Sequence, residues 1–163
     1  MAAEIEAAKK AAAIEAVRNH FPENPRFVGI GSGTTIVYVV EAIKNCGADV
    51  SRIGFVPTGY QSKQLIINAG LVPIEFDALP DSAMIDIAFD GADEVDEELN
   101  CIKGGGACLY QEKLVAMRSK QFVCVAGMSL SFPHVSLLTV DRLQKTPASP
   151  DDKMAHHPHR GGT

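Results

Sequence analysis

The sequence predicts an α/β protein in which a parallel β-sheet carries helices on both faces. Short, fully apolar segments typical of buried strands alternate with longer segments that have helical periodicity, and this alternation is typical of βαβ units. Glycine-rich and acidic motifs follow directly after several of the apolar segments. Because the carboxyl ends of parallel strands are where such sheets bind ligands, these motifs predict a site at that edge.

The predicted elements follow one another over the first 126 residues. A helix is expected over 3–20, with its apolar face formed by Ile5, Ala8, Ala12, Ile14, Val17 and Phe21. The segment 36–43 is rich in β-branched residues, which favour strands, but its length and two-sided burial favour a helix that Gly47 ends. The other predicted elements are strands at 26–30, 53–57, 71–76, 84–89 and 122–126, and helices at 61–68 and 109–119.

Composition restricts the classes of function. The chain has 163 residues, which suits one domain with a tail, and its net charge of −5 argues against the basic face that nucleic acid binding requires. No apolar run reaches the ~18 residues of a membrane span, and the acidic N-terminus does not match a secretory signal. The four cysteines show no metal-binding or pairing pattern, so we expect reduced thiols and a cytoplasmic protein.

Two regions are expected: a domain at 1–130 and a tail at 131–163. The second region holds four of the nine prolines and four of the five histidines, and its apolar periodicity fades after Val140. This composition predicts a disordered tail. His156, His157 and His159 could bind a metal adventitiously, but no native metal and no cofactor are expected.

The first candidate site motif is Gly31-Ser32-Gly33-Thr34-Thr35, which joins a predicted strand to a predicted helix. Glycines allow close approach to a ligand, and free N–H groups at a helix start favour an anion, with hydroxyls as further donors. The motif lacks the lysine of a P-loop and the full dinucleotide-binding pattern. Phosphate binding and a simple tight turn both fit it.

The second motif is Asp90-Gly91-Ala92-Asp93-Glu94, which follows a fully apolar strand. Clustered carboxylates raise one another's pKa and suit proton transfer. The alternatives are a helix N-cap or a calcium loop, although the EF-hand pattern is not met. The acidic residues that follow, Glu94, Asp96, Glu97 and Glu98, are expected to form a solvated face.

The third motif is Lys103-Gly104-Gly105-Gly106, followed by Glu112 at the start of a predicted helix. Three successive glycines carry a cost in backbone entropy, and a neighbouring lysine can stabilise a developing oxyanion. A structural hairpin is the alternative. For Glu112 a catalytic base and a surface glutamate favoured by the helix dipole are both open.

Four segments together resemble the type A ribose-5-phosphate isomerase family in sequence, order and spacing. They are Val28 to Thr35, Val56 to Gln61, Asp86 to Asp96 and Ile102 to Lys113. The resemblance covers about residues 5 to 126, and the combination of Asp-Gly-Ala-Asp-Glu with Lys-Gly-Gly-Gly is specific. It implies a Rossmann-like fold, incomplete relative to the family, and a metal-independent aldose–ketose isomerase of the pentose phosphate pathway.

The resemblance implies a role for each motif. Glu112 matches the base that moves a proton between C1 and C2 through a cis-enediol, Asp90 a carboxylate that helps to open the sugar ring, and Lys103 the lysine that stabilises enediolate charge. The segments Ser32 to Thr35, Asp90 to Asp93 and Lys103 to Gly106 match the substrate-binding loops. A sugar phosphate is the implied partner, and family members are homo-oligomers.

The sequence departs from the family after the strand at 122–126. Gly127 and Leu130 stand where the family has an aspartate and a lysine that reaches the substrate, and a further small α/β portion used in the family for subunit contacts is not matched. Two alternatives therefore accompany the enzyme: a catalytically impaired sugar-phosphate-binding module and a truncated isoform.

Overall fold

A computed structural model describes residues 1–92, 94–95, 101–102, 109–125 and 135–138 of the chain. Its α-helices are α1 (Ala2–His20), α2 (Thr34–Asn45), α3 (Tyr60–Asn68) and α4 (Leu109–Met117). Its strands are β1 (Phe27–Ile30), β2 (Gly54–Pro57), β3 (Val72–Pro73), β4 (Ile87–Gly91), β5 (Glu94–Val95), β6 (Cys101–Ile102), β7 (Phe122–Val125) and β8 (Val135–Leu138). Short 3₁₀ helices lie at Val50–Arg52 and Phe76–Ala78.

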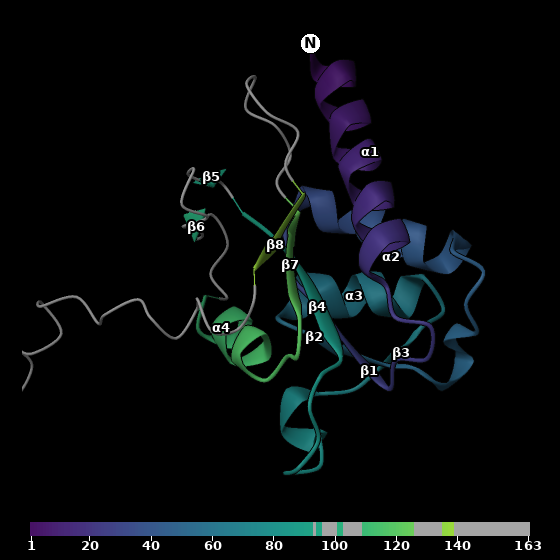
Figure 1. Ribbon diagram of the computed structural model, residues 1–163, viewed down its shortest axis with the longest axis vertical. Coiled ribbons are helices and arrows are strands. Elements are labelled where there is room, and N and C mark those ends of the chain that lie inside the picture. Colours follow the sequence, from purple (N-terminus) through teal and green to yellow (C-terminus); the bar gives the residue numbers. More distant parts are fainter. Residues whose placement is uncertain (93, 96–100, 103–108, 126–134, 139–163) are drawn as a thin grey trace, which may run out of the picture.

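The main sheet has the strand order β3-β2-β1-β4-β7-β8 (Figure 1). The first five strands in this order are parallel, so the α/β fold expected from the sequence is confirmed. The chain runs outward from β1 through β2 to β3, and then returns to the other side of β1 with β4 and β7. This reversal is a topological switch point, and open α/β sheets bind ligands at the carboxyl edge beside such a point.

Helices cover both faces of the sheet (Figure 1). One apolar cluster joins α1, α2 and α3 to the sheet through residues such as Val17, Ile36 and Ile66. The other joins α4 to the opposite face through Val115 and Ala116. β1 and β2 are buried at every position. Because helices cover both faces of the sheet, these strands have no solvent-facing side, which explains why their sequences contain no charged residue.

The helix α2 confirms the prediction for the β-branched segment. Ile36, Val39, Val40 and Ile43 recur at the i, i+3, i+4, i+7 spacing of a helical face, and all four are buried. The helix ends at Asn45, and Gly47 then takes a φ of +83°, which a residue with a side chain rarely adopts.

The apolar face predicted for the first helix is partly wrong. Ala13, Ala16 and Val17 are its buried residues, whereas Ile5 and Ile14 are nearly half exposed. Small alanines let α1 pack closely on α2, so this side of the helix faces the core although it is less apolar by composition. No helix in the described part of the chain is long and apolar enough to cross a membrane.

Two strands differ from the predicted bounds by more than one residue, and one of them, β4, begins at Ile87. The strand expected over 71–76 is limited to Val72–Pro73 at the sheet edge, and the chain turns into a 3₁₀ helix at Phe76. The strand expected over 84–89 is β4, which runs on through Gly91 because Asp90 pairs with Cys124 and Gly91 with Val125 of β7. Asp90 is therefore held within the sheet.

Within the region 131–163, where a tail is expected, the structure describes one segment, Val135–Leu138. These residues form β8, which pairs antiparallel with β7 from Phe122↔Leu138 to Val125↔Val135. Without this pairing the backbone groups along the outer edge of β7 would lack strand partners, which is costly for a buried strand. The histidines of the tail lie outside the described residues.

Asp86 joins the beginnings of β1 and β4. Its Oδ2 accepts backbone N–H groups of Arg26 at 2.7 Å and Phe27 at 3.1 Å, and its Oδ1 accepts the Lys120 ammonium at 2.7 Å. Partial burial raises the pKa of Asp86, but these three hydrogen bonds outweigh burial and lower the pKa below its ordinary 3.8.

Asp86→Asn is expected to lower the free energy of unfolding at pH 7 by about 1–3 kcal/mol. The main reason is that an uncharged amide oxygen makes weaker hydrogen bonds to the two backbone N–H groups than the carboxylate does. The lysine is 60% exposed, so its ion pair adds little. A depressed folded-state pKa stabilises the fold above the unfolded pKa, so the difference between variant and wild type should vanish as the pH falls through the folded-state pKa. Urea unfolding at several pH values measures this, with exposed Asp77→Asn as the control. A difference that is independent of pH would contradict the assignment.

Candidate active site

Two of the predicted motifs meet at the switch point. The loop after β1 begins at Gly31, and β4 ends with Asp90 and Gly91, so neighbouring parallel strands deliver both to one edge of the sheet. A hydrogen bond from the Gly31 N–H to the Phe89 carbonyl, 2.8 Å long, fixes the loop against β4.

Asp90 lies under this loop and is only 2% exposed. Its Oδ1 accepts the backbone N–H of Ser32 at 3.1 Å and of Gly91 at 2.8 Å. The carboxylate fits only because Gly31 has no side chain: a Cβ there would lie 2.0 Å from Oδ1 and 2.1 Å from Cγ of Asp90. Asp90 is thus neither a helix N-cap nor a surface residue.

Glu112 reaches the same loop from α4, on the other face of the sheet. It is 6% exposed, which corrects the alternative that it is a surface glutamate. Its Oε1 accepts the hydroxyl of Ser32 at 2.5 Å. Glu112 lies in the first turn of α4.

Ser32 therefore contacts both carboxylates. Its N–H group donates to Asp90, and its hydroxyl donates to Glu112. These residues are far apart in the sequence and come from three different elements, so this convergence is a property of the fold. Carboxylates that are held in one position, as these are, can serve as general acids or bases.

The rest of the loop forms the start of α2. Gly33 has a φ of +101°, which strongly favours glycine, and Thr34 and Thr35 begin the helix with Thr35 buried. Gln61 of α3 holds Gly33 by accepting its N–H at 3.0 Å and donating to its carbonyl at 3.4 Å. Gln61 thus holds the loop in one conformation, with threonine hydroxyls at a helix N-terminus, an arrangement suited to an anion.

Two residues beside this loop were not predicted as site residues. Gln61 is one, and Lys9 of α1 is the other, since its Nζ donates to Thr34 Oγ1 at 3.0 Å. A signal for Lys9 exists in the sequence: it shares the helical stripe of Ala13 and Ala16, which are buried. A lysine on such a stripe is unusual unless it has a polar partner.

The remaining predicted site residues are only partly placed. Ala92 follows β4 and is half-buried. Asp93 and the segment 103–106, which is Lys103, Gly104, Gly105 and Gly106, lie outside the described residues, so their roles stay predictions. Among the residues that the structure describes, no group of three or more His, Cys, Asp or Glu side chains could hold a metal ion.

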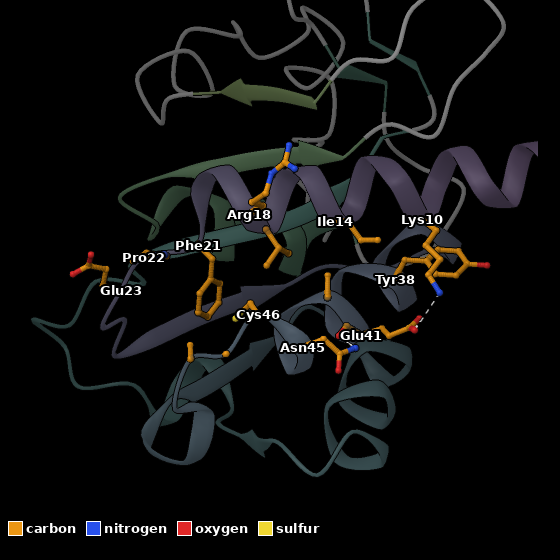
Figure 2. A pocket seen from close by; sticks show the side chains of 14 residues that line it. Lys10, Ile14, Arg18, Phe21, Pro22, Glu23, Tyr38, Glu41, Asn45 and Cys46 are labelled. Atoms are coloured by element: carbon orange, nitrogen blue, oxygen red, sulfur yellow. Dashed lines mark hydrogen bonds and ion pairs between the residues drawn. The ribbon is translucent and has the colours of Figure 1, made fainter.

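A groove of about 700 Å³ lies elsewhere, between α1 and α2 (Figure 2). Residues that line it include Ile14, Phe21, Tyr38 and Cys46. None of the residues at the switch point lines the groove. Pro22 and Glu23 do line it, and they lie before the start of β1, whereas the site lies after its end. The groove is therefore separate from the candidate active site.

The fold and this site define an α/β protein with two buried carboxylates, both hydrogen-bonded to Ser32 in an anion-type loop at the switch point of a parallel sheet. Residues 54–139 match the family model described as ribose 5-phosphate isomerase A (phosphoriboisomerase A). The chain belongs to this family.

Individual relatives agree with the family match. Ribose-5-phosphate isomerase of Schizosaccharomyces pombe is 54% identical over 122 residues, which are 75% of this chain and 43% of the relative. That of Debaryomyces hansenii is 56% identical over 129 residues, covering 79% and 50%. The chain thus spans about half the length of these curated relatives.

Solved structures of the family share the fold. Ribose 5-phosphate isomerase from Plasmodium falciparum matches with a TM-score of 0.65 and 33% identity over 73% of this chain and 50% of that chain. A D-ribose-5-phosphate isomerase in complex with phospho-erythronic acid matches with a TM-score of 0.64 and 40% identity, covering 73% and 51%.

Proposed function

We propose that this chain carries the active site of an aldose–ketose isomerase that interconverts D-ribose 5-phosphate and D-ribulose 5-phosphate. The observation that carries the proposal is the meeting of Asp90 and Glu112, both buried, on the two sides of Ser32. Family membership supplies the substrate, because the relatives are named for this reaction.

The proposed reaction is a proton transfer between adjacent carbons of the open-chain sugar. Glu112 removes the proton from C2 of the aldose, the C–H electron pair forms the C1–C2 double bond, and the carbonyl π electrons move to O1, which takes up a proton to give the cis-enediol. The C2 hydroxyl then loses its proton as the C2 carbonyl forms, so that a proton moves from O2 to O1 overall. The same carboxylate returns a proton to C1 to give the ketose, so no atom is gained or lost. The carbon acid is weak, and a placed base together with a charge sink is what this step requires.

Asp90 and Lys103 have supporting roles in the proposal. Asp90 helps to open the sugar ring and holds substrate hydroxyls, and the backbone donors on its Oδ1 keep it in place. Lys103 stabilises the charge of the enediolate, a role that rests on the family resemblance. With Asp93 and the glycines 104–106 it would complete the binding segments.

The phosphate is proposed to bind at the N-terminus of α2. Thr34 and Thr35 carry hydroxyls there, and the helix end attracts negative charge. The Lys9 ammonium, which contacts Thr34, adds a positive charge at the same place. A phosphate bound here would orient the carbon chain over the carboxylates, so that binding energy serves catalysis.

The wider assignments follow from this function. We propose residues 1–130 as the isomerase domain, a cytoplasmic location, and a place in the non-oxidative pentose phosphate pathway. The resemblance implies homo-oligomers for members of the family. We propose no oligomeric state for this chain, because it spans only about half the length of its relatives.

A binding module without turnover is the second candidate. Leu130 stands where the family resemblance expects a lysine that reaches the substrate. Loss of one such cation would weaken catalysis more than it weakens anion binding by the loop after β1, because that loop does not include residue 130.

The test is ketose formation by the purified 163-residue chain supplied with ribose 5-phosphate, with calorimetric binding of the same sugar and circular dichroism on the same sample. Turnover supports the isomerase. Binding of ribose 5-phosphate by a folded chain without turnover favours the binding module. A folded chain that neither binds nor converts the sugar would overturn both.

A further inference from the structure

Lys9 lies in an unusual electrostatic position. Its side chain is only 19% exposed, and its Nζ lies at the first turn of α2. The N-terminus of a helix carries partial positive charge, and the first turn of α2 contains no acidic residue. A lysine is disfavoured at such a place unless an anion neutralises it.

Glu6, one turn earlier on α1, supplies that negative charge in the unliganded chain. Its Oε1 accepts the Lys9 ammonium at 2.8 Å. The hydrogen bonds from Lys9 and from Tyr38 lower the pKa of Glu6, so it is ionised at neutral pH. Lys9 thus bridges Glu6 on its own helix and Thr34 on α2.

Tyr38 fixes the second oxygen of this carboxylate. Its hydroxyl donates to Glu6 Oε2 at 2.5 Å, and it lies one helical turn after Thr34 on α2. The hydrogen bond to Glu6 raises the pKa of Tyr38, so the hydroxyl stays a donor. With both oxygens engaged, the carboxylate has one orientation, and Lys9 is directed at the loop.

We propose that Glu6 and Tyr38 are positioning residues, which act through Lys9 to place its ammonium where the sugar phosphate binds. The proposal rests on the proposed function, because it needs a phosphate at the N-terminus of α2. We expect Glu6 and Tyr38 to affect the affinity for the phosphate group, because Glu6 contacts Lys9, Tyr38 contacts Glu6, and neither contacts the Asp90 and Glu112 carboxylates. The same contacts would affect an unphosphorylated sugar little.

A simple polar tie between helices would use the same kinds of contact, and the chain contains one for comparison. Lys10 of α1 pairs with Glu41 of α2 at 3.3 Å, and both side chains are about half exposed (Figure 2). This pair joins the same two helices with the same charges, but Glu41 is seven residues beyond Thr34. Glu41→Gln is therefore the matched control.

The experiment measures calorimetric Kd for ribose 5-phosphate and for inorganic phosphate, together with KM, kcat and Tm, in the full chain. Lys9→Met should weaken sugar-phosphate binding by about 10- to 100-fold, the scale of a charged hydrogen bond. Glu6→Gln and Tyr38→Phe should each weaken it by about 3- to 10-fold and raise KM, with kcat changed less than about twofold. In the Lys9→Met background they should have no further effect, because they act through Lys9.

Three outcomes would count against the proposal. Equal Kd values in Glu6→Gln, Tyr38→Phe and Glu41→Gln, with only Tm lowered, would make the Glu6–Tyr38 contact a structural tie and would overturn this proposal alone. An undiminished effect in the Lys9→Met background would also overturn it alone. Failure of the wild-type chain to bind ribose 5-phosphate would overturn the proposed function and this inference together.

Discussion

Glu112→Gln is expected to reduce kcat for ribose 5-phosphate isomerisation by about 10²- to 10⁴-fold, the range that general acid–base catalysis contributes. The substitution keeps the size of the side chain and an oxygen that can accept the Ser32 hydroxyl, but it removes the basic carboxylate. KM should change little, because the phosphate-binding loop is untouched. The loss should therefore appear in kcat and kcat/KM to a similar degree.

Steady-state ketose formation measures this effect, and thermal unfolding by circular dichroism verifies that the variant is folded. Glu23→Gln provides the control, since Glu23 is an exposed glutamate that precedes β1. Turnover of Glu112→Gln within a few-fold of wild type would remove Glu112 from the role of base. Asp90 would then be the described carboxylate that could take it.

Gly31→Ala is also expected to have a large effect on activity, by a different route. The new Cβ would lie 2.0 Å from Oδ1 and 2.6 Å from Cβ of Asp90, and Asp90 is held in a strand, so the carboxylate cannot simply rotate away. We expect kcat/KM to fall by about 10²-fold, as for a misplaced reacting group. The fold should lose about 1–3 kcal/mol, as for other overpacked cores.

Gly54→Ala is the matched control for this prediction. Its Cβ would lie 2.4 Å from Cδ1 of Ile74, so it also overpacks the sheet, but β2 places it away from the two carboxylates. Its stability should fall while kcat/KM stays near wild type. If Gly31→Ala and Gly54→Ala lose activity only in proportion to the unfolded fraction, the close fit of Gly31 against Asp90 has no catalytic role.

The two predictions separate chemistry from placement. Glu112 is expected to act on the substrate directly, whereas Gly31 acts by allowing Asp90 to sit under the loop. Both predictions concern the two carboxylates that are hydrogen-bonded to Ser32, namely Glu112 directly and Asp90 through its contact with Gly31. The double variant measures whether the two groups work as a unit, because coupling appears as a departure from the sum of the two single effects.

Most of the fold was predictable from residue order, because local patterns encode it. Continuous apolar segments identify buried strands, and helical spacing identifies α2 in spite of its β-branched residues. The errors arose where long-range contacts decide. β4 extends to Gly91 because β7 pairs with it, and β3 is shorter than predicted because the chain turns into a 3₁₀ helix at Phe76.

The types of site residue were also predictable. A glycine and hydroxyl loop after a strand indicates an anion, and an acidic residue after the next apolar strand indicates proton transfer. Local sequence could not reveal that Glu112 is buried or that Lys9 contacts Thr34, because each contact joins elements separated by many residues. The sequence pattern identified the buried face of α2 but only part of that of α1, and it does not show what packs against either helix.

Residue order alone therefore determines the alternation of strands and helices, the edge of the sheet that carries the site, and the family. Only the tertiary structure decides that Ser32 lies between two carboxylates and that Glu6 and Tyr38 direct Lys9 toward the loop. The physical reason is that hydrogen bonds act over about 3 Å. Strand order and helix packing, rather than spacing along the chain, bring such groups within that distance.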